Sequence, residues 1–190
     1  MYSRKVNSET LSFGVSGLLY KANVLMYDHQ SDSLWSQIKR EAVVGPATGK
    51  KLKVLPSTIT SWEKWRSKHP KTSVLSIDTG YSRDYSRDPY ADYYESQSGF
   101  FSLFNKGPGE EEKALVIGLT IDGQPKAYPV DDVRKHGEII DGSGDAAITL
   151  RHDPENDQIH VTQGNSKLEA VIVYWFVWKG LYPESEFYRD

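Results

Sequence analysis

One stretch of the chain places ionisable and phenolic side chains close together. It runs from Asp78 to Tyr85 and includes Tyr81, Arg83 and Asp84. Two carboxylates at this spacing could act as an acid and a base or hold a cation, and the guanidinium could bind an anionic group. The structural alternative is an Asp–Arg pair that fixes a long loop while the tyrosines cover the edge of a core. Both interpretations stay open, because no catalytic spacing separates them.

Other candidates for chemistry are weaker. Met26, Asp28 and His29 offer a thioether, a carboxylate and an imidazole, a set that would suit copper. Strand alternation puts Met26 and Asp28 on one face and His29 on the other, so we expect Met26 to pack in the core. Ser16 lacks the second glycine of a nucleophile elbow. The sequence shows neither a phosphate-binding loop nor a dinucleotide fingerprint.

Composition excludes several classes of site. The 190 residues include no cysteine, which removes disulfides, thiolate metal sites and cysteine nucleophiles. The 23 basic and 26 acidic residues are interspersed, so we expect no nucleic-acid partner. The longest apolar run, Ala170–Trp178, is too short for a membrane span, and no apolar segment at the N-terminus predicts a secretory signal. We expect a soluble chain of one domain, residues 1–190.

The scaffold that must position these side chains is predicted to be mainly β. Apolar runs at residues 10–17 and 23–28, joined by a turn near residues 20–23, predict a hairpin. Residues 43–44, 51–55 and 74–77 are further strand candidates. Residues 78–99 have little periodicity and predict a long ordered loop.

One helix is predicted between two marked ends. Thr60 and Glu63 have the spacing of a capping box, and the helix should stop at His69-Pro70. Trp62, Trp65 and His69 then share one face. We expect the two tryptophans to anchor a core.

Two later hairpins are predicted from their turn residues. Residues 115–121 and 126–130 flank Asp122-Gly123, a pair that suits a tight hairpin turn, and a helical turn at 131–136 should end at Gly137. Residues 146–152 and 158–162 flank a type I turn at 153–156, which places His152 and His160 on opposite faces. The last apolar run, 171–178, predicts a strand buried on both faces, with a short buried helix as the alternative.

A series of short motifs resembles the family catalogued as domain of unknown function 3179. The motifs, in order, are Phe13-Gly-Val-Ser-Gly-Leu-Leu-Tyr20, Met26-Tyr-Asp28, Ser33-Leu-Trp-Ser-Gln37, Val44-Gly-Pro46, Trp62 to Trp65 with His69-Pro70, Asp78-Thr-Gly80, Arg83-Asp-Tyr85, Lys126-Ala-Tyr-Pro129 and Tyr174-Trp-Phe176. The family is functionally uncharacterised, so the resemblance implies a shared fold and no established activity.

The resemblance also carries expectations about the chain's start. Relatives carry a Cys-Pro-Leu-Cys segment just ahead of the position matching Tyr2, and we expect this chain to lack it, together with any metal or redox site that its cysteines form. Relatives often have an upstream signal or anchor, which implies an extracytoplasmic origin by resemblance alone. The fold expected is an antiparallel β domain, a small barrel or sandwich, with one or two short helices.

Three hypotheses about function follow. The first is a binding module that holds a small molecule or a metal ion in one cleft, using Asp28, Gln37, Asp78, Arg83, Asp84, Tyr85, Lys126 and Tyr128. The second is a hydrolase or redox enzyme in which Asp84 or Asp78 is the base and Arg83 or Lys126 holds an anion. The third is a structural or interaction domain with an exposed apolar patch.

Overall fold

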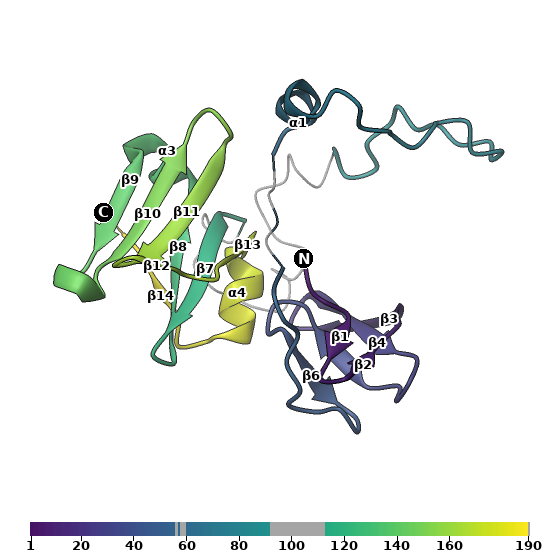
Figure 1. Cartoon of the computed structure of the whole chain (residues 1–190), viewed down its shortest axis with the longest axis horizontal. Helices are drawn as coiled ribbons and strands as arrows, with labels where there is room; N and C mark the ends of the chain where they lie inside the picture. The colour runs from purple at the N-terminus through teal and green to yellow at the C-terminus, as the bar shows by residue number, and fades with distance from the viewer. Residues whose placement is uncertain (56, 58–59, 92–112, 190) are drawn as a thin grey trace.

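Antiparallel β-sheet is the main regular structure of the molecule, as Figure 1 shows for this computed structural model. The structure describes residues 1–55, 57, 60–91 and 113–189. The mainly β fold class predicted from the sequence is confirmed. The described part has three α-helices of seven residues each, and its sheets do not close into a barrel.

The N-terminal residues build a small β unit around a core of their own. Its strands are β1 (Lys5–Val6), β2 (Glu9–Thr10), β3 (Phe13–Tyr20), β4 (Asn23–Asp28), β5 (Leu34–Ser36) and β6 (Glu41–Val44). The first two form a hairpin, and the others form a sheet in the order β3-β4-β5-β6. Trp35 is fully buried at the centre, and Phe13 and Met26 pack against that core. The predicted first hairpin and the packing of Met26 are therefore confirmed.

The strand predicted at residues 51–55 is wrong. Only isolated bridges form there, from Glu41 to Lys51 and from Tyr2 to Val54. The segment instead wraps the outer edge of β6, where the Ala42 amide donates to the Lys50 carbonyl at 3.0 Å. A short covering segment satisfies the edge of the sheet without forming a strand of its own.

The C-terminal residues form two more sheets. One has the order β13-β7-β8-β14, with β14 parallel to β8, and the other has the order β12-β11-β10-β9. The elements are β7 (Leu115–Ile121), β8 (Gln124–Pro129), α3 (Val130–His136), β9 (Glu138–Asp141), the 3-10 turn η1 (Gly144–Ala146), β10 (Ile148–Asp153), β11 (Gln158–Gln163), β12 (Ser166–Lys167), β13 (Val171–Tyr174) and β14 (Glu186–Phe187). Helix α3 and both sheets share a core that includes Tyr128, Val133 and Leu150.

Both hairpins predicted in this half are confirmed. Asp122 and Gly123 have φ angles of 47° and 81°, as a tight hairpin turn requires, and Gly137 ends α3 with a φ of 75°. In the β10–β11 hairpin, Leu150 faces Val161 and Asp153 faces Gln158. The turn residues and the alternation of apolar side chains together fix this register. A slip of one residue would move the apolar side chains to solvent.

The last apolar run is a strand only in its first half. Residues 171–174 form β13, and α4 (Trp175–Leu181) follows. The prediction of one continuous strand is wrong because Val177, Trp178 and Leu181 have helical spacing and are all buried. Trp178 lies over Gly118 so closely that a Cβ on that glycine would come within 2.4 Å of the indole.

A third core joins the N-terminal sheet to the C-terminal half. Ile38 of the N-terminal unit is buried with Val116, Val177 and Trp178 of the C-terminal half. At the surface of the same seam, Arg40 forms an ion pair with Glu169. The two halves are thus connected by buried apolar contacts as well as by charge.

Helix α1 (Trp62–Lys68) begins one residue later than its capping box predicts. Ser61, not Thr60, is the N-cap, and its Oγ accepts from the Lys64 amide at 3.3 Å. The helix buries none of its residues. Trp62 and Trp65 are 50% and 39% exposed, so the prediction that they anchor a core is wrong.

The segment after α1 lies entirely at the surface. Every described residue from 65 to 91 is exposed, and the strand predicted at 74–77 is wrong because no strand pairs with it. Residues 78–91 lack regular strands, as the loop prediction requires, while residues 92–99 of that prediction lie outside the described residues. No helix of the described part is long and apolar enough to span a membrane.

Candidate functional site

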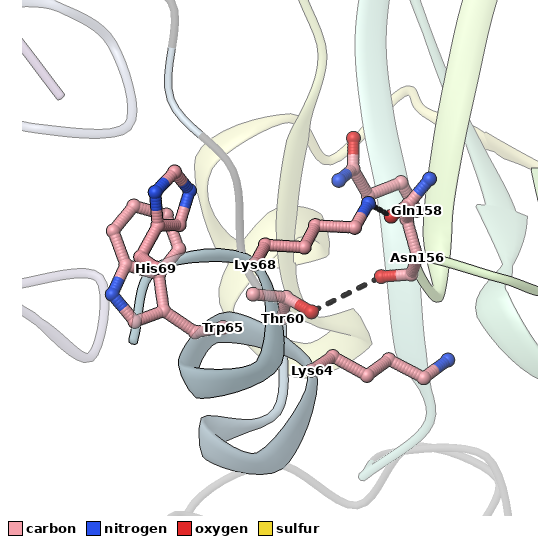
Figure 2. Close-up of a pocket in the computed structure, with 7 residues that line it drawn as sticks. All are labelled: Thr60, Lys64, Trp65, Lys68, His69, Asn156 and Gln158. Atoms are coloured by element: carbon pink, nitrogen blue, oxygen red, sulfur yellow. Dashed lines mark hydrogen bonds between the residues drawn. The ribbon is translucent and has the colours of Figure 1, made fainter. Parts of the chain in front are cut away.

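The α1–hairpin cleft lies between α1 and the turn of the β10–β11 hairpin (Figure 2). Its volume is about 220 Å³, and its lining residues are Thr60, Lys64, Trp65, Lys68, His69, Asn156 and Gln158. That volume is below the roughly 300–1,000 Å³ of pockets for drug-sized ligands. The cleft therefore fits a small molecule or a single acid group.

Three polar contacts hold α1 against the hairpin. Thr60 Oγ1 donates to the Asn156 carbonyl at 3.2 Å, and Lys64 Nζ donates to the Pro154 carbonyl at 2.9 Å. Lys68 Nζ donates to Asn156 Oδ1. Because Lys64 and Lys68 are four residues apart, they extend from one face of the helix to the same turn.

The turn itself is held by Asp153. Its Oδ1 accepts from the amides of Glu155 at 2.9 Å and Asn156 at 3.3 Å, and its Oδ2 accepts from Asn156 Nδ2. The Asn156 side chain lowers the pKa of Asp153 by this hydrogen bond. The Asp153 carboxylate therefore orients the Asn156 amide that Lys68 contacts.

Within the described residues, no ion pair joins the cleft lysines to the acids of the turn, Asp153, Glu155 and Asp157. Lys64 and Lys68 donate only to neutral oxygens, and neither takes part in a salt bridge among residues 1–55, 57, 60–91 and 113–189. Two ammonium groups beside one concave surface create a local positive potential. An anion that enters the cleft would gain from both.

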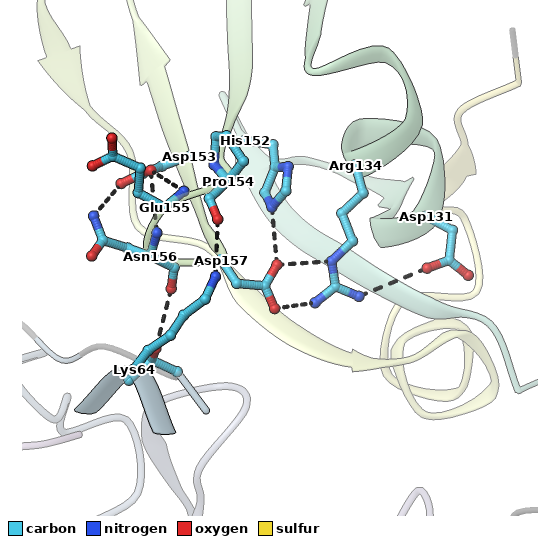
Figure 3. Close-up of polar contacts among 10 residues, drawn as sticks. Lys64, Asp131, Arg134, His152, Asp153, Pro154, Glu155, Asn156 and Asp157 are labelled. Atoms are coloured by element: carbon cyan, nitrogen blue, oxygen red, sulfur yellow. Dashed lines mark hydrogen bonds and ion pairs between the residues drawn. The ribbon is translucent and has the colours of Figure 1, made fainter. Parts of the chain in front are cut away.

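A second network lies at the same turn (Figure 3). His152 Nε2 and Asp157 Oδ1 are 2.9 Å apart, and Arg134 of α3 donates to both oxygens of Asp157, at 3.2 and 3.0 Å. The hydrogen bond from His152 is the main cause of the lowered pKa of Asp157, and Arg134 adds to it. Asp157 is thus already paired and leaves the two lysines uncompensated.

An aromatic pair forms one wall of the cleft. The rings of Trp65 and His69 lie 4.1 Å apart at 35°, and Trp65 Nε1 donates to Thr72 Oγ1 at 3.0 Å. The amides of Asn156 and Gln158 form the opposite wall in Figure 2. The cleft therefore combines cations, amide donors and an aromatic surface.

A family model described as a protein of unknown function, DUF3179, matches residues 1–171. The chain belongs to this family. The match includes every residue that lines the α1–hairpin cleft. Searches of the curated proteins and of the solved structures found no match.

The eight residues predicted from the DUF3179 resemblance lie in three parts of the fold, and none of them lines the cleft. Asp28 and Gln37 belong to the N-terminal sheet. Asp78, Arg83, Asp84 and Tyr85 lie on the exposed segment after α1, and Lys126 and Tyr128 lie on β8. Their role in ligand binding stays a prediction.

Asp28 is a buried carboxylate with a structural set of partners. It accepts from the Ser31 amide at 2.6 Å, from Ser31 Oγ at 2.9 Å and from Trp35 Nε1 at 2.7 Å. Burial raises its pKa, but the hydrogen bonds from Trp35 and Ser31 outweigh burial and hold the pKa below its usual value. Gln37 Oε1 is buried without a hydrogen-bond partner in the described part of the chain.

Asp84 is poorly suited to act as a base. Asp78 and Asp84 are both exposed, and the hydrogen bond from Ser86 lowers the pKa of Asp84. A general base works best when its pKa lies near the working pH. Within the described residues, no group of three or more His, Asp or Glu is placed to hold a metal ion.

Lys126 and Tyr128 meet at Asp141. Lys126 Nζ lies 2.6 Å and Tyr128 Oη 2.5 Å from Asp141 Oδ2, and Glu186 lies 3.4 Å from the same ammonium. Burial raises the pKa of Tyr128, and the hydrogen bond to Asp141 raises it further. This tyrosine therefore stays protonated, and the cluster ties β8 to β9 and β14.

The cleft residues were missed because half of the site is visible only in three dimensions. The spacing of Lys64 and Lys68 on a predicted helix was a usable signal for a basic face. The hairpin residues Asn156 and Gln158 lie about ninety positions away, and no local pattern links them to that helix.

Proposed function

We propose that this chain is a binding module for a small anionic ligand, which it holds in the α1–hairpin cleft. The observation that carries the proposal is the pair of ammonium groups, Lys64 and Lys68, that reach one concave site and donate only to neutral oxygens there. Lysine binds phosphate and carboxylate as a point charge. An anion would replace a neutral acceptor with a charged one, which strengthens each hydrogen bond.

The other lining groups support selection by size and shape. Thr60, Asn156 and Gln158 supply a hydroxyl and two amides, which can hydrogen-bond to the rest of a ligand. The volume of about 220 Å³ favours a ligand such as a phosphate monoester of a short carbon chain or a small dicarboxylate. Trp65 supplies an apolar surface and a fluorescent group beside the site.

The test is calorimetric titration of the purified chain with inorganic phosphate and with succinate. The double variant Lys64→Gln/Lys68→Gln should bind the better of the two anions at least tenfold more weakly. The control variant Lys50→Gln/Lys53→Gln removes the same charge from exposed positions outside the cleft and should bind as the unchanged chain does.

Salt dependence provides a second criterion. Affinity should fall as the sodium chloride concentration is raised, because salt screens the attraction between exposed charges. Absence of binding to both anions at low ionic strength would overturn the proposal. Equal loss of affinity in the cleft variant and the control would also overturn it, because only net charge would then matter.

A further inference from the structure

The segment that follows α1 is an arm that packs against no core among the described residues. We define the arm as residues 70–91, all of which are exposed. Its apolar residues Val74, Leu75 and Ile77 are 67%, 96% and 79% exposed. Figure 1 shows the arm extending away from the N-terminal sheet and from the β10–β11 hairpin. Large apolar side chains grouped in this way mark an interaction site.

The arm's apolar centre also has strand character that its own chain does not use. Residues 72–77, Thr-Ser-Val-Leu-Ser-Ile, are rich in β-branched residues and contain no charge and no proline. No strand of the described part pairs with them. The Thr72 amide donates to the His69 carbonyl at 3.0 Å, whereas residues 73–77 form no backbone–backbone hydrogen bond within the described part and are available to a partner sheet.

One edge of the N-terminal sheet has no pairing strand in the part of the chain that the structure describes. β3 is the outermost strand in the order β3-β4-β5-β6, and its residues Val15, Leu18 and Leu19 are 76%, 53% and 63% exposed. Its eight residues contain no charged residue and no proline, the groups that usually protect an edge strand. Its pairing with β4 shifts register between Val15 and Leu19, where the Leu18 amide donates to Ser16 Oγ at 3.1 Å, so an additional strand would follow an irregular but uncharged and apolar edge.

The opposite edge of the same sheet is covered. Along β6, the Ala42 amide donates to the Lys50 carbonyl, the Gly49 amide donates to the Ala42 carbonyl, and Lys51 pairs with Glu41. The chain thus protects one edge with its own residues, whereas none of the described residues pairs with the outer edge of β3. This contrast within one sheet indicates that β3 has a partner.

We propose that residues 73–77 of one copy of this chain add as a strand to β3 of a second copy. Both segments are apolar and uncharged, so pairing buries side chains of both without burying a charge. If each copy gives its arm and accepts the other's, the exchange closes around a twofold axis into a dimer. The arm starts at α1, beside the hairpin, and Figure 1 places it apart from β3 of its own chain, which favours exchange between chains.

The absence of cysteine in the sequence permits a direct test by cross-linking. Leu75→Cys protein is mixed with Val15→Cys or Leu19→Cys protein and oxidised with copper phenanthroline. We expect a mixed disulfide between the arm and β3 for at least one of the two edge positions. The control, Val44→Cys, places a thiol on the covered edge at a position that is 55% exposed, close to the 63% of Leu19, and should form at least tenfold less mixed disulfide.

Oligomeric state provides the second measurement. The unchanged chain should sediment as a dimer at concentrations where Leu75→Lys and Leu19→Lys sediment as monomers, because a lysine on an edge strand opposes pairing. Val44→Lys should remain dimeric. All three positions are exposed, so the variants should fold, and circular dichroism checks this.

Three outcomes would overturn the proposal. These are a monomer at all concentrations with no mixed disulfide, a dominant Val15–Val15 or Leu19–Leu19 cross-link, and a cross-link that forms only within one chain carrying both cysteines. Anion binding does not enter this test, because Leu19 lies outside the α1–hairpin cleft. The two proposals can therefore fail separately.

Discussion

At the residue scale, the polar groups of this chain fall into two sets that differ in their hydrogen-bond partners. Asp28, Asp153 and Asp157 are all held by hydrogen bonds from nearby donors, and the pKa of each carboxyl is lowered by those bonds. Such carboxylates stabilise turns. Lys64 and Lys68 differ because they contact only neutral oxygens, which is why we assign function to the lysines and structure to the acids.

Asp28 should make stability depend on pH. Its folded-state pKa is lowered, so the ionised carboxylate stabilises the fold at pH values above the unfolded pKa of about 3.9, and this stability is lost as pH falls through the folded pKa. Asp28→Asn should lower the free energy of unfolding at pH 7 by about 1.5–3 kcal/mol, the range for hydrogen bonds to a buried charge. Urea unfolding followed by circular dichroism measures this difference.

The direction of this pH dependence tests the assigned cause. The gap between the unchanged chain and Asp28→Asn should narrow as pH falls below about 3.9, since the unfolded chain then binds a proton that the folded carboxyl, with its lowered pKa, binds only at lower pH. Asp32→Asn is the matched variant, because Asp32 is exposed in the same turn at a φ of 54°, which asparagine also adopts. A gap that widens at low pH would contradict the assigned cause.

At the scale of elements, the sequence patterns correctly predicted the strands whose pairing partners are close in the chain. The β10–β11 register was predictable because Asp153 and Pro154 fix the turn and the apolar alternation fixes the faces. Trp62 and Trp65 were assigned to a core because their spacing shows that they share a helix face. Spacing does not show whether that face contacts protein or solvent. The same limit applies to 74–77, where strand propensity is present and a neighbouring strand is not.

The N-cap of α1 should determine how stable the helix side of the cleft is. Ser61→Ala removes the acceptor for the Lys64 amide and should destabilise the helix by about 1 kcal/mol. Because α1 buries no residue, the free energy of global unfolding should stay unchanged within about 0.5 kcal/mol. Hydrogen exchange of the Trp65 and His69 amides should become roughly fivefold faster, as expected for that loss of local stability.

Ser67→Ala is the control for this prediction. It removes a hydroxyl that donates to the Lys64 carbonyl at 2.9 Å and leaves the cap intact. Exchange at Trp65 should remain slow in this variant, since alanine favours the helix. If anion affinity falls in Ser61→Ala and not in Ser67→Ala, an ordered α1 is part of the binding site.

At the scale of the molecule, the three cores raise the question of whether the two halves unfold together. The N-terminal core around Trp35 and the C-terminal core around Leu150 have no buried member in common, and the third core connects the two halves through Ile38. Length alone allows one domain of 190 residues or two small ones. The prediction of a single domain therefore depends on the strength of this seam.

Ile38→Ala should destabilise the whole molecule and not one half. Ile38 is 7% exposed, and truncating a buried isoleucine costs about 2–5 kcal/mol when a cavity remains. If the seam makes one domain, the unchanged chain unfolds in a single calorimetric transition whose calorimetric and van't Hoff enthalpies agree. Ile38→Ala should move that transition to lower temperature or divide it into two.

Ile140→Ala provides the comparison, since it truncates the same side chain on β9, where it is 60% exposed. It should shift the midpoint much less than Ile38→Ala, because little apolar area leaves the interior. Two transitions in the unchanged chain, with only one of them sensitive to Ile38→Ala, would show that the halves are separate domains. A single domain requires the N-terminal sheet and the β10–β11 hairpin to lose their amide protection together, because Ile38 is buried against the sheet that packs beneath that hairpin.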